Sequence, residues 1–426
     1  MRYDSSQFCT DRAGRQDYCG PKSYIGIPDV LYKNNGDNTF INVSDYSNIG
    51  KLNGKGLGVV ANDFNSDGFP DIYVANDGEA NYLWINQGDG TFLNKAVAMG
   101  AAFNMIGMPE AGMGLAIGDA LGNTSEGMLP GHRKSKYGWI ETYLSNRYAE
   151  NQKRGVPSDD TQLAFYLVEH LLENGALNPE QLAKIFLSRE IYGMGMSVNE
   201  FREKIRAGIE WQKAGTHSAG NGALMRIAPI IGPHLKSPSQ ELWKDAAVCS
   251  AVTHNDPASI ACCVAFVMLL SALLTSDQLP EPSWWMDTFE AIAGPIEGET
   301  KYQPRGGVYL GAYTGSLTRF TVREVRKALA DDIDTVSFGE RVYSGAYLME
   351  TMPCVLFILA KYGSDPERSI LEAVNHTKDN DTIAAIVGAA IGAFYGREAI
   401  PSNWIDNLTG RLGANDDGRV FELVNA

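Results

Sequence analysis

Two short acidic sequences, Ser158-Asp-Asp-Thr161 and Thr377-Lys-Asp-Asn-Asp-Thr382, contain the residues best suited to chemistry. Each precedes a predicted helix that is too apolar to lie on a surface. A helix start needs only one capping side chain, so capping alone is the simpler interpretation. Each sequence, however, offers two carboxylates, and buried like charges repel unless a cation lies among them. If the two helix starts meet, the sequence predicts an all-oxygen site for one or two Mg²⁺ or Mn²⁺ ions, with the ligands Ser158, Asp159, Asp160, Asp379, Asp381 and Thr382.

A glycine-rich sequence, His217-Ser-Ala-Gly-Asn-Gly-Ala-Leu-Met-Arg226, is the second candidate element. Closely spaced backbone N–H groups in such a turn can surround an anion. Alone, the pattern is typical of any turn, but beside a cation site it predicts a pyrophosphate-binding loop. A histidine at a helix entry, in Thr253-His254, is either structural or in contact with a ribose or base. The predicted substrate-binding residues are Ser218, Gly220, Asn221, Gly222, Arg226 and His254.

The elements that must position these residues change character near Pro109. From there the apolar residues follow a helical rhythm, as in Leu163, Leu167, Val168 and Leu171, and the run from Thr382 to Tyr395 is small and aliphatic. Before Pro109, short alternating stretches are separated by Asn-Gly and Gly-Asp turns, which indicates β-hairpins. We therefore predict a β-repeat region over residues 1–108 and an all-α domain over residues 109–426.

The β region repeats itself, because Leu31 to Phe40 returns as Leu83 to Phe92. The offset of 52 residues between the copies fits one blade of a β-propeller. We therefore predict that the region is a small β fragment of about two propeller-type repeats. Between the copies, oxygen-bearing side chains at positions 1, 3, 5 and 9 of a tight loop predict a Ca²⁺ site, whose simpler alternative is a polar turn without metal. Its ligands would be Asp63, Asn65, Asp67 and Asp71. These sequences resemble the FG-GAP/VCBS repeats of secreted proteins with an ASPIC/UnbV-like region.

The junction between the two regions falls in a sequence that could belong to either of them. Gly112-Met-Gly-Leu-Ala-Ile-Gly-Asp119 matches Gly56-Leu-Gly-Val-Val-Ala-Asn-Asp63, but the residues after Asp119 do not rebuild the calcium loop. This indicates a join at a chance similarity, either a natural fusion or a product of sequence assembly. A fragment of so few blades should have exposed strand edges and little stability of its own.

Composition bounds the class of protein. The 426 residues are 44% hydrophobic and 20% charged, as in ordinary globular proteins, and the net charge of −15 argues against a nucleic-acid partner. Cys249, Cys262, Cys263 and Cys354 lie in apolar contexts typical of buried thiols, whereas Cys9 and Cys19 could close a small loop. The uncharged run 258–276 favours a buried central helix over a membrane span. The first residues contain no apolar signal segment, so we expect a cytoplasmic protein with no membrane partner.

In order along the chain, the motifs Gly118-Asp-Ala-Leu-Gly122 with Glu126, the Asp-Asp-Thr helix start, the Ser-Ala-Gly-Asn-Gly loop, Thr253-His254 and the late Asp-x-Asp-Thr resemble those of the ADP-ribosylglycohydrolase family. The resemblance covers residues 112–400. It implies an all-α fold around two Mg²⁺ ions and hydrolysis of the bond between ADP-ribose and its acceptor. It also implies that the helix starts bind the metals, that Glu126 lies at the ribose or the metal, and that the loop 218–222 holds the diphosphate. The family commonly has Gly-Gly where this chain has Thr377-Lys378, so we expect Lys378 to point away from the ions.

The resulting hypothesis is a metal-dependent hydrolase that releases ADP-ribose from an ADP-ribosylated protein or related conjugate. Glycosidic cleavage passes through an oxocarbenium-like state, in which a carboxylate can orient or deprotonate the attacking water. The catalytic candidates are Glu126, Asp160 and Asp379. Two alternatives stay open: a catalytically inactive ADP-ribose-binding or calcium-dependent interaction protein, and a two-metal phosphohydrolase. The acceptor linkage would be read by loops such as 301–320, which carry no recognisable signal.

Overall fold

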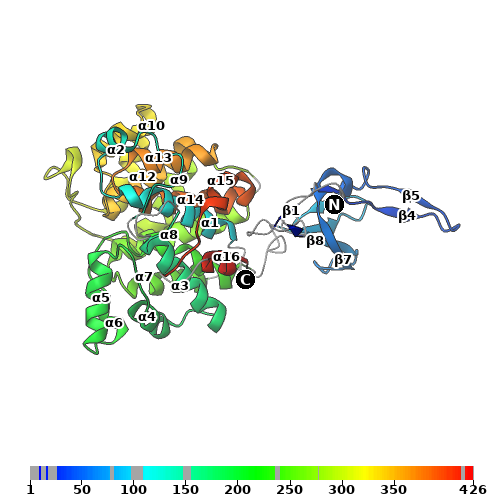
Figure 1. Cartoon of the computed structure of the whole chain (residues 1–426), viewed down its shortest axis with the longest axis horizontal. Coiled ribbons are helices and arrows are strands. Elements are labelled where there is room, and N and C mark those ends of the chain that lie inside the picture. Colours follow the sequence, from blue (N-terminus) through cyan, green and yellow to red (C-terminus); the bar gives the residue numbers. More distant parts are fainter. Residues whose placement is uncertain are drawn as a thin grey trace. The chain divides into compact units, whose positions relative to one another are not determined.

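The computed structural model separates into two compact units, residues 1–107 and 108–426 (Figure 1). The structure describes residues 9–10, 16–17, 26–76, 81–96, 109–146, 155–235, 240–276, 278–413 and 418–425. The predicted loop closure between Cys9 and Cys19 lies outside the described residues, because Cys19 is not among them.

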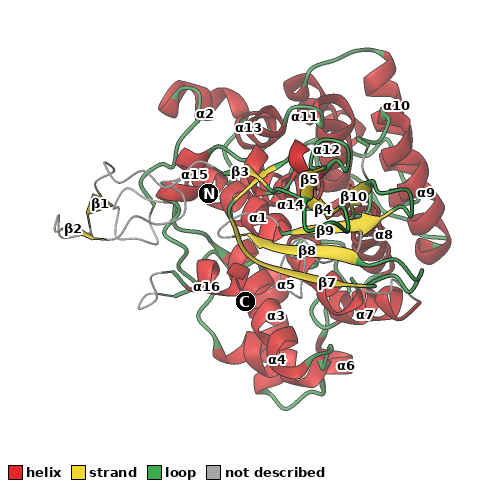
Figure 2. Ribbon diagram, turned by 90° about the vertical axis from the view of Figure 1, so that its right-hand side faces the viewer, coloured by secondary structure: helices red, strands yellow, loops and turns green. Residues whose placement is uncertain are grey.

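The first unit is built from short antiparallel strands. Its main sheet has the order β10-β9-β8-β7, and β7 and β8 run side by side in Figure 2. Two-stranded pairs accompany it: β1 with β2, β3 with β6, and β4 with β5. The strands are β1 (Cys9–Thr10), β2 (Gln16–Asp17), β3 (Ile27–Pro28), β4 (Tyr32–Asn34), β5 (Phe40–Asn42), β6 (Asn53–Gly54), β7 (Gly56–Asn62), β8 (Asp71–Asn76), β9 (Tyr82–Asn86) and β10 (Phe92–Asn94).

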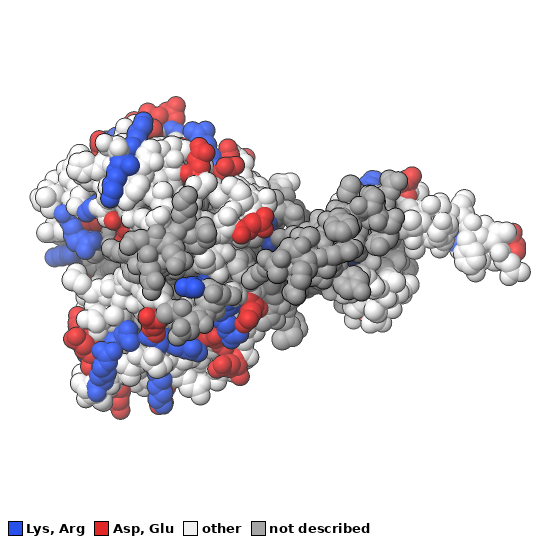
Figure 3. Space-filling view, viewed as in Figure 1, with Lys and Arg blue, Asp and Glu red and all other residues white. Residues whose placement is uncertain are grey.

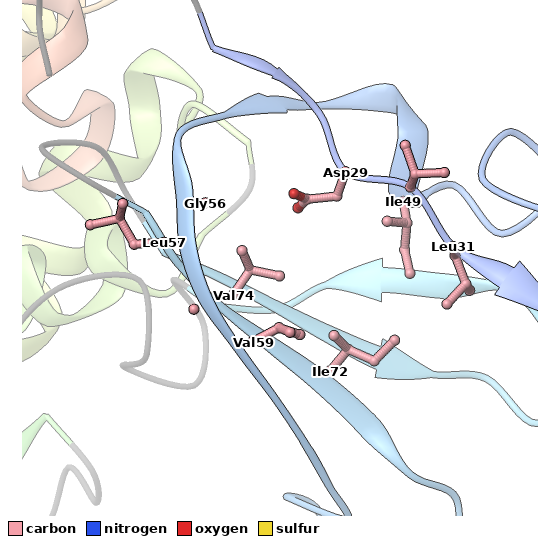
Figure 4. Close-up of a pocket in the computed structure, with 10 residues that line it drawn as sticks. Asp29, Leu31, Ile49, Gly56, Leu57, Val59, Ile72 and Val74 are labelled. Atoms are coloured by element: carbon pink, nitrogen blue, oxygen red, sulfur yellow. The ribbon is translucent and has the colours of Figure 1, made fainter. Parts of the chain in front are cut away.

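The two copies of the repeat differ in how well they are covered. Trp84 and Phe92 of the second copy are 2% and 7% exposed, whereas the equivalent Tyr32 and Phe40 of the first are 59% and 61% exposed. All residues of β7 are exposed as well. Beside β7 lies a cavity of ≈ 460 Å³ with mainly apolar walls, into which the carboxylate of Asp29 projects (Figure 4). The exposed strand edge predicted for this fragment is therefore present.

The second unit is mainly helical, which confirms the predicted fold class. Short 3₁₀ turns connect several helices: η3 (Asn123–Ser125), η5 (Leu224–Arg226), η6 (Ala228–His234), η7 (Gly307–Tyr309) and η8 (Arg397–Ala399). The helices are α1 (Pro109–Gly122), α2 (Pro130–Tyr137), α3 (Asp159–Asn174), α4 (Pro179–Ser188), α5 (Met196–Arg206), α6 (Trp211–Ala214), α7 (Gln240–Ala251), α8 (Pro257–Leu274), α9 (Pro282–Glu297), α10 (Leu317–Ala330), α11 (Thr335–Val342), α12 (Leu348–Tyr362), α13 (Pro366–His376), α14 (Asn380–Tyr395), α15 (Ser402–Asn407) and α16 (Arg419–Asn425).

Helix α8 is apolar on all sides, and other parts of the helical unit cover most of its surface. It packs against α7, α9 and α14, and it contains the fully buried thiols of Cys262 and Cys263. By length and composition alone this helix could cross a membrane, although 67% of the apolar window is buried in protein. A core helix gives the same signal. On the face of the helical unit shown in Figure 3, acidic and basic side chains are interspersed.

Helices α1 and α14 lie in very close contact, and glycine makes that contact possible. Gly114, Gly118 and Gly122 recur every fourth residue and therefore share one face of α1. A Cβ on Gly114 would collide with the backbone of Gly388, one on Gly118 with that of Ala384, and one on Gly122 with that of Asp381. This stripe lets the two backbones touch, so the carboxyl-terminal end of α1 lies directly against the acidic start of α14.

Candidate active site

The two acidic helix starts meet, as the sequence analysis requires. Asp159 and Asp160 begin α3, Asp379 and Asp381 flank the start of α14, and all four side chains line one cavity of ≈ 180 Å³. The same cavity is lined by the glycine-rich loop and by the first turn of α5. Its other polar and charged lining residues are Glu126, Ser197, Ser218, Asn221, His254, Arg305 and Thr382.

The carboxylates form two overlapping clusters. One ligand atom each of Asp119, Asp160 and Asp381 lie within 4.8 Å of one another, and the same holds for Glu126, Asp379 and Asp381. Asp381 belongs to both clusters and therefore joins them. Apart from the exposed Glu126, these side chains are buried.

Neither helix start is explained by capping alone. The side chains of Ser158 and Asp379, at the capping positions of α3 and α14, make no capping hydrogen bond to their own helices. The Ser158 hydroxyl instead donates to Oδ1 of Asp119 at 2.6 Å. Oδ2 of Asp379 accepts from Asn221 Nδ2 at 2.5 Å, which ties α14 to the glycine-rich loop.

Asp119 on α1 is a structural centre that the sequence analysis missed. Its carboxylate is fully buried and accepts from the backbone N–H and the hydroxyl of both Ser158 and Thr161, with a further bond from Asn123. Asp119 therefore caps α3 from a different helix. A signal was present in the sequence: an acid between glycines in an apolar helix must be buried, and a buried carboxylate needs several donors.

Arg133 on α2 is a second positioning residue that was missed. It is fully buried, and its guanidinium donates to the backbone oxygens of Asn375 and Thr377 at 3.2 and 2.6 Å and to Ser125 Oγ at 2.9 Å. Burial lowers its pKa to about 10, so the group stays charged at neutral pH. Arg133 thus fixes the chain immediately before Asp379.

Burial and crowding raise the pKa values of the cavity acids. Desolvation, with Glu126 as the next cause, raises the pKa of Asp379 to about 7. Desolvation, then Glu126 and Asp160, raise the pKa of Asp381 well above its usual value. The pKa of Asp160 is raised in the same way by burial and then by Asp119. Raised pKa values favour the protonated forms of these acids, whereas a divalent cation would favour their ionised forms.

The donor set fits a hard divalent cation. Oδ1 of Asp160 is buried and has no hydrogen-bond partner, so this oxygen has unsatisfied lone pairs. The converging ligand atoms are all oxygens, and such a set suits Mg²⁺ or Mn²⁺ better than it suits zinc. This buried acidic cluster could therefore bind metal.

The glycine-rich loop is shaped by His254 behind it. A Cβ on Gly222 would lie 2.9 Å from Cε1 of His254, and Ser218 Oγ accepts from the Gly220 N–H at 3.2 Å. Burial lowers the pKa of His254 to about 3, so the ring is neutral, and its Nδ1 lies 2.8 Å from Thr253 Oγ1. Only an unsubstituted backbone can pass so close to the imidazole.

Not every predicted site residue reaches the cavity. Ser158 and Arg226 are absent from its lining: the former is turned to Asp119, and the guanidinium of the latter lies behind the loop, 2.5 Å from Thr253 Oγ1 and over the ring of Phe186. Both are fully or almost fully buried. Lys378 is also absent from the lining, in line with its expected direction, because its ammonium group contacts the hydroxyl and ring of Tyr343.

The predicted calcium loop in the β unit is closed by its own backbone. Oxygens of Asp63 accept from the N–H groups of Asp67 and Gly68, and Oδ1 of Asn65 also accepts from Asp67. Asp71 is buried and accepts from the N–H groups of Phe64 and Asn86. Among the described residues, the carboxylates of this loop are not a group converging within 4.8 Å. Calcium binding by this loop stays a prediction.

Comparisons with known proteins agree with this architecture. The ADP-ribosylglycohydrolase family profile matches residues 110–425, and the FG-GAP-like repeat profile matches residues 28–74 and 63–123. The ADP-ribosyl-[dinitrogen reductase] glycohydrolase of Rhodospirillum rubrum is 27% identical over 305 residues, which cover 70% of this chain and 88% of that protein. The ADP-ribosylhydrolase ARH3 of Xenopus tropicalis is 25% identical over 341 residues, which cover 73% of this chain and 93% of that protein. A solved structure, an "ADP-ribosylglycohydrolase-related protein complex", superposes with a TM-score of 0.55 and 25% identity over 75% of this chain and 96% of that one.

Proposed function

The chain belongs to the ADP-ribosylglycohydrolase family, and we propose that it is a metal-dependent hydrolase. It removes ADP-ribose from an ADP-ribosylated protein side chain or related conjugate by cleaving the glycosidic bond at the distal ribose. The observation that carries this proposal is the meeting of the α3 and α14 acidic starts in a cavity that also contains the glycine-rich loop. A cation site and an anion-binding loop in one cavity match a substrate whose sugar hydroxyls and diphosphate are joined in one molecule.

The residues that would hold two Mg²⁺ ions, or Mn²⁺, are Asp159, Asp160, Asp379, Asp381 and Thr382. Bound ions of this kind supply positive charge that orients sugar hydroxyls and polarises water. We assign Ser158 to holding the start of α3, because its hydroxyl is committed to Asp119. Asp119 keeps Ser158 and Thr161 in place and so positions the two carboxylates between them.

The chain's own groups then act on the distal ribose. Water adds to the anomeric carbon as the bond to the acceptor breaks, and positive charge develops on the sugar during this step. Glu126, which is exposed at the edge of the cluster, is placed to orient or deprotonate that water. The acceptor leaves with a proton. The N–H groups of the 218–222 loop bind the diphosphate and fix the ribose relative to the acids.

The test is release of ADP-ribose from an ADP-ribosylated protein, measured with Mg²⁺ and after chelation. We expect release to require the metal and Asp381→Ala to lower the rate by about 10²-fold or more, because a shared acid of both clusters is lost. Asp287→Ala, which removes a surface acid paired with Arg326, is the control and should leave the rate unchanged.

The products separate this proposal from its alternatives. AMP in place of ADP-ribose would show attack on a phosphate and identify a phosphohydrolase. Binding of ADP-ribose without any turnover would identify an inactive binding protein. Equal rates for the wild type and Asp381→Ala would contradict the role given to the acidic cluster.

A further inference from the structure

The loop between α9 and α10, residues 298–316, contributes one residue to the cavity, and it is a cation. Arg305 lines the cavity together with the acids and the glycine-rich loop. Among the described residues, it is the only lysine or arginine in that lining. Its side chain is 52% exposed, so it can meet a ligand that enters from solvent.

Arg305 is held firmly in place. The buried carboxylate of Glu350 on α12 accepts from the backbone N–H, Nε and Nη2 of Arg305, at 3.2, 3.4 and 3.3 Å. The guanidinium also lies 4.6 Å from the ring centre of Tyr347. These bonds use one edge of the guanidinium, and within the described chain no hydrogen bond is found for its Nη1. Arg305 therefore keeps donors for a ligand while its backbone is fixed.

The loop that carries Arg305 is packed closely against α11 and the segment after it. A Cβ on Gly306 would collide with the ring of Tyr343, and one on Gly307 with the carbonyl of Arg341. Gly307 also has a φ of +71°, a backbone conformation that favours glycine. Backbone hydrogen bonds between Tyr302 and Gly315, at 2.8 and 3.0 Å, close the base of the loop. The position of Arg305 is thus set by the backbone bonds at the base of the loop and by the close packing of Gly306 and Gly307.

Arg305 lies at the glycine-loop end of the cavity. Tyr347, under its guanidinium, forms an antiparallel bridge with Gly220, and the next residue, Leu348, donates its N–H to the carbonyl of Ala219. An anion bound by the 218–222 amides would therefore approach Arg305. The acids line the same cavity and would repel such an anion, so a fixed cation at this end changes the balance in its favour.

We propose that Arg305 binds the diphosphate of the substrate together with the 218–222 loop and thereby positions the distal ribose at the acidic cluster. This inference rests on the proposed function. Arg305 acts as a binding and positioning residue and takes no part in bond cleavage. Charge-assisted hydrogen bonds from arginine to phosphate are strong, and the guanidinium matches the geometry of phosphate oxygens.

The experiment measures ADP-ribose affinity by calorimetry, and kcat and KM for an ADP-ribosylated protein, with Mg²⁺ present throughout. Arg305→Ala should raise both Kd and KM about tenfold or more, with a much smaller change in kcat. The dependence of Kd on salt concentration should also weaken, because a phosphate contact is lost. Arg326→Ala is the matched control, since Arg326 is 48% exposed and ion-paired but lies on the surface of α10.

A double variant separates phosphate binding from neutralisation of Glu350. Arg305→Met combined with Glu350→Leu removes both charges and leaves no buried unpaired carboxylate. If Arg305 binds the diphosphate, the double variant stays as weak as Arg305→Ala. Recovery of wild-type affinity in the double variant would overturn the proposal.

Three further outcomes are decisive. A higher KM with unchanged ADP-ribose affinity would show that Arg305 contacts the acceptor, and would also overturn the proposal. A wild type that binds ADP-ribose through Arg305 but releases none from the conjugate would contradict the hydrolase function while leaving the role of Arg305 intact. Normal turnover with an unaltered KM in Arg305→Ala would contradict the role of Arg305 while leaving the hydrolase function intact.

Discussion

Gly122→Ala tests whether the close contact of α1 and α14 positions the acidic cluster. Gly122 has right-handed helical backbone angles, so alanine can adopt its conformation without strain. A Cβ there, however, would lie 2.5 Å from both the Cα and the N of Asp381, and 2.8 Å from the carbonyl carbon of Asn380. The obstacle is backbone on both sides, so no side chain can rotate away to make room.

The size of the effect follows from that distance. Ordinary van der Waals contact begins near 3.4 Å, so the start of α14 must move by about 1 Å. Overpacking of this kind costs about 1–3 kcal/mol, and the gain from replacing glycine in a helix offsets about 0.5–1 kcal/mol of it. We therefore expect a net loss of about 1–2 kcal/mol in the free energy of unfolding. A displacement of Asp381 by about 1 Å should lower the hydrolysis rate by about 10²-fold.

Chemical unfolding and the ADP-ribose release assay measure these two effects separately. Gly131→Ala is the control, because Gly131 lies within α2 and a Cβ there would have no heavy atom within 4 Å. This control should gain about 0.5–1 kcal/mol and keep full activity. If Gly122→Ala is as stable and as active as Gly131→Ala, the glycine contact does not determine the geometry of the site.

Three other changes probe the acids. Asp119→Ala should lower the free energy of unfolding by about 2–4 kcal/mol and abolish activity, since it leaves the buried donors of Thr161 and its neighbours unsatisfied. A variant that unfolds in urea at the same concentration as the wild type would contradict this. Because the folded-state pKa of Asp379 is raised to about 7, the metal-free protein should lose stability as pH rises from about 4 to 7. Saturating Mg²⁺ should therefore raise Tm more at pH 8 than at pH 5, and an equal shift at both would refute this account. If the β-unit loop binds Ca²⁺, calorimetry should detect binding that Asp63→Asn with Asp67→Asn removes, and heat that persists in this variant would place the ion elsewhere.

The sequence predicted the acidic cluster because its chemistry is local. Asp159 and Asp160 adjoin the start of one apolar helix, and Asp379 and Asp381 that of another, so burial of both helices forces the acids together or requires protonation. Arg226 shows where such reasoning stops. It follows the glycine-rich loop directly, yet its guanidinium turns toward Thr253 and Phe186, because the chain bends into a 3₁₀ turn after Ala223. The orientation of the Arg226 side chain cannot be predicted from the spacing or the types of the residues in the loop.

The junction sequence shows why local similarity did not determine secondary structure. Gly56 to Asn62 forms β7, whereas the similar Gly112 to Asp119 lies within α1, although the FG-GAP-like match extends to residue 123. The difference is the spacing of glycine: Gly118 and Gly122 continue a four-residue spacing from Gly114, whereas Asn62 and Ser66 stand at the matching positions after Gly58. Gly114, Gly118 and Gly122 fall on one helical face, which packs directly against the backbone of α14.

The supply of hydrogen-bond donors distinguishes the two acidic regions better than the number of acids does. In the β unit, Asp63 and Asp71 each accept two backbone N–H groups, so these carboxylates are stabilised as they stand. In the helical unit Asp119 accepts from Ser158, Thr161 and Asn123, whereas Asp160 keeps one oxygen that has no partner. A buried carboxylate in that condition must gain a proton or a cation. The same comparison identifies Asp119 as the group that holds the helices and favours Asp160 as a ligand of the proposed cation site.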